Sequence, residues 1–160
     1  MQPWIGDSWK QTGILILGES WYDNEVKLEE YIPNWINKGQ SDYLFSRIFN
    51  VCSGFHTSNA TLQQREIFWS KIIFHNFVNW SVGKERKDRP KPDDYLLAKR
   101  QLPEMLREIM PRKIWLLGKE QIEHSKPIVE SLGIKHEVAP HPCGWGVKTE
   151  TLKASWAKLF

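Results

Sequence analysis

The sequence is poor in cysteine and lacks long apolar runs, and each shortage excludes a class of protein. Its two cysteines, Cys52 and Cys143, are far apart and cannot form a four-cysteine zinc or iron–sulfur site. No stretch reaches the roughly 18–20 consecutive apolar residues of a membrane span. The first residues show no basic and then apolar signal segment. We therefore expect a cytoplasmic protein with free thiols, no membrane association, no metal and no other cofactor.

The sequence also lacks a strong charge imbalance and a glycine-rich dinucleotide motif. Its 22 Lys and Arg residues against 19 Asp and Glu residues give a net charge of +3, which permits an anionic partner without requiring one. No G-x-G-x-x-G follows a predicted strand, which argues against a dinucleotide-binding fold. The length of 160 residues predicts a single domain over 1–160, which we expect to be a monomer.

Aromatic residues, in contrast, are abundant. The chain has nine Trp, seven Phe and four Tyr, which excludes an intrinsically disordered protein. Each Trp is bulky and carries an N–H donor that needs a partner, so nine exceed what a small core requires. Some of them are expected on a surface that contacts a partner.

Hydrophobic periodicity predicts strands that alternate with helices. Apolar runs at 13–17, 71–78, 113–117 and 135–139 predict four strands, and the first and third suit strands buried on both faces of a parallel sheet. Helical spacing predicts helices over 41–50, 61–70, 93–110, 119–132 and 149–160. Pro103 is expected to kink or split the third helix, whose apolar stripe would comprise Leu96, Leu97, Leu102, Met105, Leu106 and Ile109. This alternation predicts an α/β layered sheet.

Polar or glycine residues stand where three of the predicted strands end. In an open α/β sheet, ligands bind outside the carboxyl ends of the strands, so Gly18, Asn76 and His141 are expected to converge on one cleft. Each residue also has an ordinary structural explanation. Gly18 can simply form a turn, Asn76 can satisfy a neighbouring backbone group, and His141 can belong to a rigid loop between two prolines.

A basic segment precedes the third predicted helix. Residues 84–92 carry five basic and two acidic side chains, a net charge of +3. Such a segment is usually a solvated loop. Its alternative role is contact with DNA phosphates through Lys84, Arg86, Lys87 and Arg89.

Two short motifs, taken together, resemble the uracil-DNA glycosylase superfamily. The segment Gly18-Glu19-Ser20-Trp21-Tyr22 is similar to the G-Q-D-P-Y motif of that family, and His141-Pro142-Cys143-Gly144-Trp145 is similar to its H-P-S-P-L motif. Asn76 lies where the family has its base-reading Asn. The resemblance covers residues 13–146 and rests on motif order and strand context. It implies a three-layer α/β/α sandwich with a central four-stranded, mainly parallel sheet.

The resemblance implies a role for each motif residue in cleaving an extruded nucleotide. Gly18 would let the backbone approach the base, the amides of Glu19 and Ser20 would bind a pyrimidine carbonyl, and Asn76 would read the base edge. His141 would donate a hydrogen bond to the departing base.

The family's water-orienting Asp corresponds to Ser20, which cannot carry a negative charge. Glu19 and Asp23 are its possible substitutes.

Aromatic residues of the motifs acquire roles by the same resemblance. Trp145, next to Gly144, corresponds to the family's Leu wedge that fills the space left in the duplex. Tyr22 corresponds to the Tyr that crowds the C5 side of the base, and Trp21 lies beside it at the base pocket. An aromatic side chain should stack on the base, and the choice falls on Phe45, with the alternatives Tyr31, Trp35 and Tyr43.

The sequence thus predicts a monofunctional DNA glycosylase that hydrolyses the N-glycosidic bond of uracil or a modified pyrimidine. Ser20 and the two motif tryptophans allow an alternative substrate, because some relatives in bacterial defence excise modified bases from phage DNA. The competing hypotheses are a non-catalytic module that binds modified DNA and a small-molecule-binding α/β domain. The sequence does not identify the base, separate repair from defence, or show whether single- or double-stranded DNA is preferred.

Overall fold

The protein alternates strands and helices along its chain. The computed structural model describes residues 2–22, 27–38, 42–84 and 88–160. The strands in these segments are β1 (Trp4–Ile5), β2 (Ile14–Gly18), β3 (Ile72–Asn76), β4 (Lys113–Leu117) and β5 (Lys135–Ala139). The helices are α1 (Leu28–Lys38), α2 (Tyr43–Ser53), α3 (Leu62–Ser70), α4 (Pro92–Ile109), α5 (Lys119–Ser131) and α6 (Thr149–Lys158), with a short 3-10 turn at Trp9–Gln11.

The sheet has five strands in the order β1-β3-β2-β4-β5. The four expected strands are all present and mutually parallel. The expected count of four is wrong, because β1 adds an antiparallel edge that pairs Trp4 with Phe74 and makes the sheet mixed. A strand of two residues is too short to produce a hydrophobic run in the sequence. It is recognised only by its pairing with β3.

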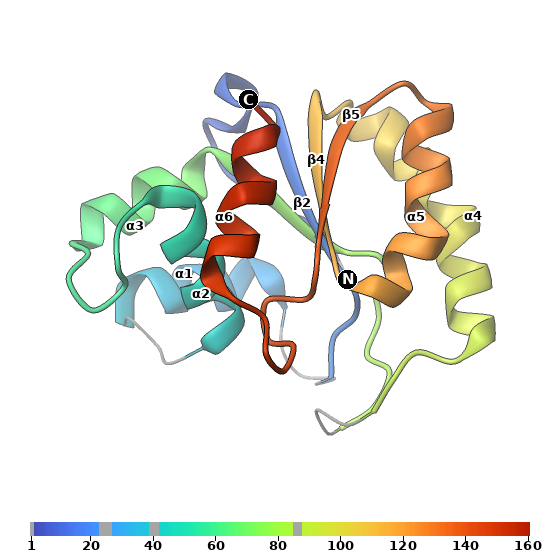
Figure 1. The fold of residues 1–160 in the computed structure, drawn as a ribbon, viewed down its shortest axis with the longest axis horizontal. Coiled ribbons are helices and arrows are strands. Elements are labelled where there is room, and N and C mark those ends of the chain that lie inside the picture. The colour runs from blue at the N-terminus through green and yellow to red at the C-terminus, as the bar shows by residue number, and fades with distance from the viewer. Residues whose placement is uncertain (1, 23–26, 39–41, 85–87) are drawn as a thin grey trace.

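Helices cover both faces of the sheet, which gives an α/β fold of three layers (Figure 1). Helices α4 and α5 lie on one side, and α1, α2, α3 and α6 lie on the other. Alternate residues of β2 face the two layers: Ile14 and Ile16 pack with the second group, and Leu15 and Leu17 pack with α4 and α5. Burial on both faces explains why the run is continuously apolar.

Helix α4 differs from its sequence prediction in its buried face. It continues as one element through Pro103, which excludes the split, one of the two effects expected of that proline. Its buried residues are Tyr95, Ala98, Leu102 and Leu106, whereas Leu96 and Leu97, expected in the apolar stripe, are exposed. The buried face therefore follows the spacing 95, 98, 102 and 106, and it includes a tyrosine.

Buried polar contacts hold the strand ends at one edge of the sheet. The Nε2 group of Gln121 on α5 donates to the carbonyl oxygens of Leu17 (3.3 Å) and Leu117 (3.1 Å), and Ser125 donates to its Oε1 at 2.7 Å. The amides of Phe77 and Val78 donate to the carbonyl oxygens of Gly18 and Glu19, both at 2.9 Å. The segments that follow β2 and β3 therefore remain side by side beyond the sheet.

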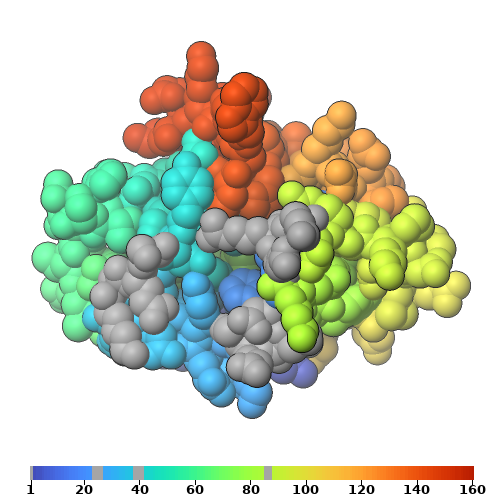
Figure 2. Space-filling model, turned by 90° about the horizontal axis from the view of Figure 1, so that it is seen from below, coloured from blue at the N-terminus to red at the C-terminus, as the bar shows by residue number. Residues whose placement is uncertain are grey.

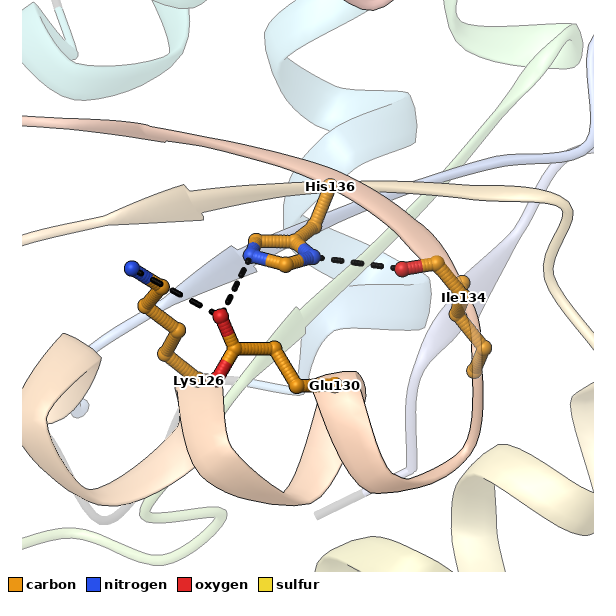
Figure 3. A network of polar contacts seen from close by, with 4 residues as sticks. All are labelled: Lys126, Glu130, Ile134 and His136. Carbon is orange, nitrogen blue, oxygen red and sulfur yellow. Dashed lines mark hydrogen bonds and ion pairs between the residues drawn. The ribbon is translucent and has the colours of Figure 1, made fainter.

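A polar network joins the end of α5 to β5 (Figure 3). Glu130 lies 3.6 Å from Lys126 and 3.8 Å from Nε2 of His136, and Nδ1 of His136 donates to the carbonyl oxygen of Ile134 at 3.2 Å. Glu130 and Lys126 are about half exposed, so this network contributes little to the free energy of unfolding.

None of the helices in the described segments is long and apolar enough to cross a membrane.

Candidate active site

A cavity of about 590 Å³ opens at the carboxyl ends of the parallel strands. Figure 2 looks onto this edge and shows the surface hollowed around the blue residues near the end of β2, between the cyan start of α2 and the yellow-green segment before α4. Three strand ends line the cavity through residues 19–22, residues 118–120 and His141 with its neighbours Cys143 and Gly144. This is the edge at which an α/β sheet binds ligands, and the volume is typical of a ligand site.

Gly18 and Asn76 lie next to each other where β2 and β3 end. They are register partners in the parallel pair, and a Cβ atom on Gly18 would clash with Oδ1 of Asn76. A larger residue at position 18 would therefore displace the Asn76 amide. Neither residue lines the cavity itself. Gly18 immediately precedes the lining residue Glu19, and Asn76 is 2% exposed.

Three buried polar atoms in this region have no hydrogen-bond partner in the described part of the chain. They are Nδ2 of Asn76, Oγ of Ser20 and Nε1 of Trp21, half of the six such atoms found among the described residues. Buried polar groups are nearly always paired, and each unpaired one destabilises a fold by about 1–3 kcal/mol. All three atoms lie at or directly after the ends of β2 and β3.

His141 follows β5 and lines the cavity as a neutral hydrogen-bond donor. Its Nδ1 accepts a hydrogen bond from the amide of Cys143 at 3.2 Å, so the ring proton lies on Nε2. Burial, together with the positive charge of Arg89, lowers the pKa of His141 to about 4. At neutral pH the ring therefore offers an N–H donor without a positive charge.

Two carboxyl groups meet one phenol at the wall of the cavity. The Tyr95 hydroxyl lies 3.1 Å from Oε1 of Glu19 and 3.2 Å from Oε2 of Glu120. Burial raises the pKa of Glu19, as does the charge of Glu120, whereas the hydrogen bond from Tyr95 and the charge of Arg89 oppose this rise. Tyr95 and Glu120 were not among the predicted site residues. The buried-face spacing of α4 could have identified Tyr95.

The remaining motif aromatics lie in different environments. Trp21 and Tyr22 line the cavity, as does Tyr31 from α1. Phe45 is completely buried behind Trp21 and Tyr31, at ring-centroid distances of 6.3 and 5.4 Å. Of the four stacking candidates, Tyr31 alone lines the cavity. Trp35 is buried in the core, and Tyr43 is exposed on α2.

Trp145 projects from the loop after β5, next to the cavity residue Gly144. Its side chain is fully exposed, at 103%. The guanidinium of Arg47 on α2 donates to the carbonyl oxygens of Pro142 and Val147, which flank Trp145 in the chain. Arg47 thus fixes both sides of the loop. No sequence pattern marked this arginine, because its partners are about a hundred residues away.

Part of the predicted basic segment reaches the cavity. Lys84 and Arg89 line it, and Arg89 donates to the Tyr22 hydroxyl at 2.9 Å. Arg86, Lys87 and Asp23, which were also predicted for the site, lie outside the described residues. Within the residues that are described, no group of three or more His, Cys, Asp or Glu side chains could hold a metal ion.

Comparisons with known proteins add no information about this site. No protein-family model matches the chain, and a search of curated proteins finds no match.

Proposed function

We propose that this protein is a monofunctional DNA glycosylase with a uracil-DNA glycosylase-like fold, which hydrolyses the N-glycosidic bond of an extruded pyrimidine. One observation carries the proposal. Gly18, which leads into the cavity residue Glu19, lies against Asn76 of the neighbouring strand, and His141 lines the same cavity as a neutral donor. A glycine that permits close approach, an amide that reads a base edge and an imidazole that stabilises a leaving base are the groups this reaction requires.

The proposed reaction begins with extrusion of the nucleotide and recognition of its edge. Nδ2 of Asn76 donates to a carbonyl oxygen of the base, which supplies the partner that this buried group lacks. As the bond between C1′ and the base nitrogen breaks, its electron pair moves to the base. The Nε2–H of His141 then stabilises the negative charge on the base oxygen. A donor of this kind contributes about 3 kcal/mol to the transition state.

The exposed aromatic and basic groups around the cavity suit a DNA duplex. Trp145 fills the space that the extruded nucleotide leaves, and it stacks on the neighbouring bases. Lys84 and Arg89, at the cavity, are positioned to bind phosphates. Arg47 holds the Trp145 loop so that the wedge is preorganised.

The unpartnered donors favour a modified base as the second candidate substrate. Uracil offers two carbonyl oxygens, whereas Asn76, Trp21, Ser20 and His141 together present four donor groups. A hypermodified cytosine that carries additional oxygen atoms would use the remaining donors. This substrate would give the protein a role in defence against phage DNA instead of repair.

The decisive assay treats duplex and single-stranded oligonucleotides that contain uracil, hydroxymethylcytosine or a glucosylated cytosine. Wild-type protein should leave alkali-labile abasic sites in at least one substrate, and His141→Ala should form them far more slowly. Base-dependent binding without any product would instead indicate a non-catalytic module. Neither product nor salt-dependent DNA binding would point to a small-molecule site and contradict the proposal.

A further inference from the structure

The proposed reaction needs a group that accepts a proton from the attacking water, and Ser20 cannot serve. A serine hydroxyl does not ionise near neutral pH. Three described carboxyl groups line the cavity, those of Glu19, Asp42 and Glu120. Both oxygens of Asp42 are already engaged, since Oδ1 accepts from the amide of Phe45 at 2.9 Å and Oδ2 accepts from the Tyr31 hydroxyl at 2.7 Å. Among the described residues, the cluster of Glu19, Tyr95 and Glu120 therefore supplies the remaining candidates, while Asp23 lies outside them.

The Tyr95 hydroxyl has one proton but lies within hydrogen-bond distance of two carboxyl groups. It can donate to Glu19 or to Glu120, but not to both at once. When both contacts are hydrogen bonds, one carboxyl group must carry a proton and donate it to the phenol oxygen. Burial and the two carboxylates raise the pKa of Tyr95, so the phenol remains protonated. The cluster thus holds the phenol proton between two carboxyl groups.

We propose that Glu19 is the general base of the glycosylase reaction and that Tyr95 and Glu120 are its positioning residues. The inference rests on the proposed function. Water oxygen forms a bond to C1′ while the bond from C1′ to the base nitrogen breaks, and the electron pair leaves with the base. One water proton passes to Glu19 and is later released to the base or to solvent. The products are an abasic sugar and the free base, and no other reactant is consumed.

The charged and titratable groups that contact Glu19 or line the same cavity come from several elements. They include Asp42 before α2, and His124 of α5 stacks on Tyr95 at a ring-centroid distance of 4.4 Å. Helix α4 contributes Tyr95, and the start of α5 contributes Lys119 and Glu120. The segment before α4 contributes Lys84 and Arg89, and the loop after β5 contributes His141. Tyr95 and Arg89 favour the ionised form of Glu19, whereas burial and Glu120 oppose it. Removing Tyr95 or Glu120 should therefore shift the pKa of Glu19 in opposite directions.

The opposite pKa shifts expected for Tyr95 and Glu120 variants can be tested by the pH dependence of cleavage. Single-turnover cleavage is measured against pH for wild type and for Glu19→Gln, Tyr95→Phe and Glu120→Gln, with Glu123→Gln as control. Glu19→Gln should lower the rate at least about 100-fold. Tyr95→Phe should move the acidic limb of the profile to higher pH, and Glu120→Gln should move it to lower pH. Glu123 is an exposed carboxylate one helical turn beyond Glu120, and its loss should change neither rate nor profile.

A second measurement separates failure of this inference from failure of the proposed function. The Glu19 carboxyl group is titrated in the free protein by carbon NMR, with folding checked by thermal melting. Opposite pKa shifts in the two variants support the inference, as does loss of cleavage in Glu19→Gln. An active wild type with an equally active Glu19→Gln, or shifts of the same sign, would overturn it while the function stands. A wild type inactive on every base would overturn the proposed function, and this inference with it.

Discussion

Two polar regions of the molecule differ in how their hydrogen bonds are satisfied. In the network between α5 and β5, Glu130 pairs with Lys126 and His136, whose other ring nitrogen donates to Ile134 (Figure 3). At the ends of β2 and β3, by contrast, Asn76, Ser20 and Trp21 keep buried polar atoms without partners in the described residues. The polar groups of the first region thus have partners within the fold, whereas under the proposed function those of the second receive partners from the bound nucleotide.

Under the proposed function, this contrast separates groups that serve the fold from groups that serve the reaction. A satisfied surface network adds little to the stability, and its removal should change little. Unpartnered buried donors destabilise the folded state, so they persist where a ligand uses them. Substitutions at the cavity should therefore change cleavage, whereas substitutions in the α5–β5 network should change neither cleavage nor stability by much.

The largest effect should come from replacing His141 at the cavity, with His136 of the α5–β5 network as the matched control. His141→Ala removes the neutral donor at the cavity and should lower the cleavage rate about 100- to 1000-fold. The matched change His136→Ala, in the α5–β5 network, should leave the rate within about twofold, because that residue lies outside the cavity lining. Equal effects of the two variants in a single-turnover assay would contradict the assignment.

Buried histidine should make the stability depend on pH. Burial lowers the pKa of His75 to about 4, and its side chain is 4% exposed. An unfolded histidine has a pKa of about 6.5, so between these values the unfolded state binds more protons and stability falls as the pH falls. The loss attributable to His75 should be about 2–3 kcal/mol from neutral pH to about pH 4.5.

Urea denaturation at the two pH values tests this prediction. His75→Leu should abolish its share of the loss, whereas the exposed control His56→Ala should leave the loss unchanged. If His75→Leu has the pH dependence of the wild type, then His75 is not a buried neutral group.

The loop that carries Trp145 should matter for duplex DNA. Trp145→Ala removes the stacking group and should lower cleavage of a duplex about tenfold, but that of a single strand much less. Arg47→Met, which releases Pro142 and Val147, should act in the same direction with a smaller effect. Phe160→Ala, an exposed aromatic at the chain end, is the control. Equal losses on the two substrates would argue against a wedge.

The smallest effect should come from the satisfied network itself. Glu130→Gln removes the carboxylate between Lys126 and His136, and it should change the free energy of unfolding by less than about 1 kcal/mol. Cleavage should remain unchanged. A larger loss in thermal denaturation would show that this network stabilises the fold more than its exposure indicates.

The sequence predicted those parts of the fold that leave a periodic signal. Continuous apolar runs identified β2 and β4 because both faces of these strands are buried. The edge strand β1 has only two residues and produced no pattern. Helix α1 does have a helical pattern, with Leu28, Ile32, Trp35 and Ile36 buried on one face, but Pro33 within it argued against a helix. The predicted stripe of α4 comprises aliphatic residues and methionine only, so it includes the exposed Leu96 and Leu97 and omits the buried Tyr95.

The site was predictable where the chemistry coincides with the end of a strand. The rule that parallel strands share one carboxyl edge brought Gly18, Asn76 and His141 together, and the structure has Gly18 and Asn76 in register. Glu120 and Arg47 act through contacts between elements far apart in the chain. Such contacts depend on helix packing, which the local sequence does not encode.

The central claim is that this cavity hydrolyses an N-glycosidic bond, and isotope transfer tests it most directly. DNA containing the candidate base is incubated with the wild-type protein in water enriched in the heavy oxygen isotope, and both products are analysed by mass spectrometry. Hydrolysis at C1′ predicts an abasic sugar and a released base that contains no heavy oxygen, with neither product from His141→Ala at comparable times. Heavy oxygen in the base, or intact DNA with every base tried, would contradict the account.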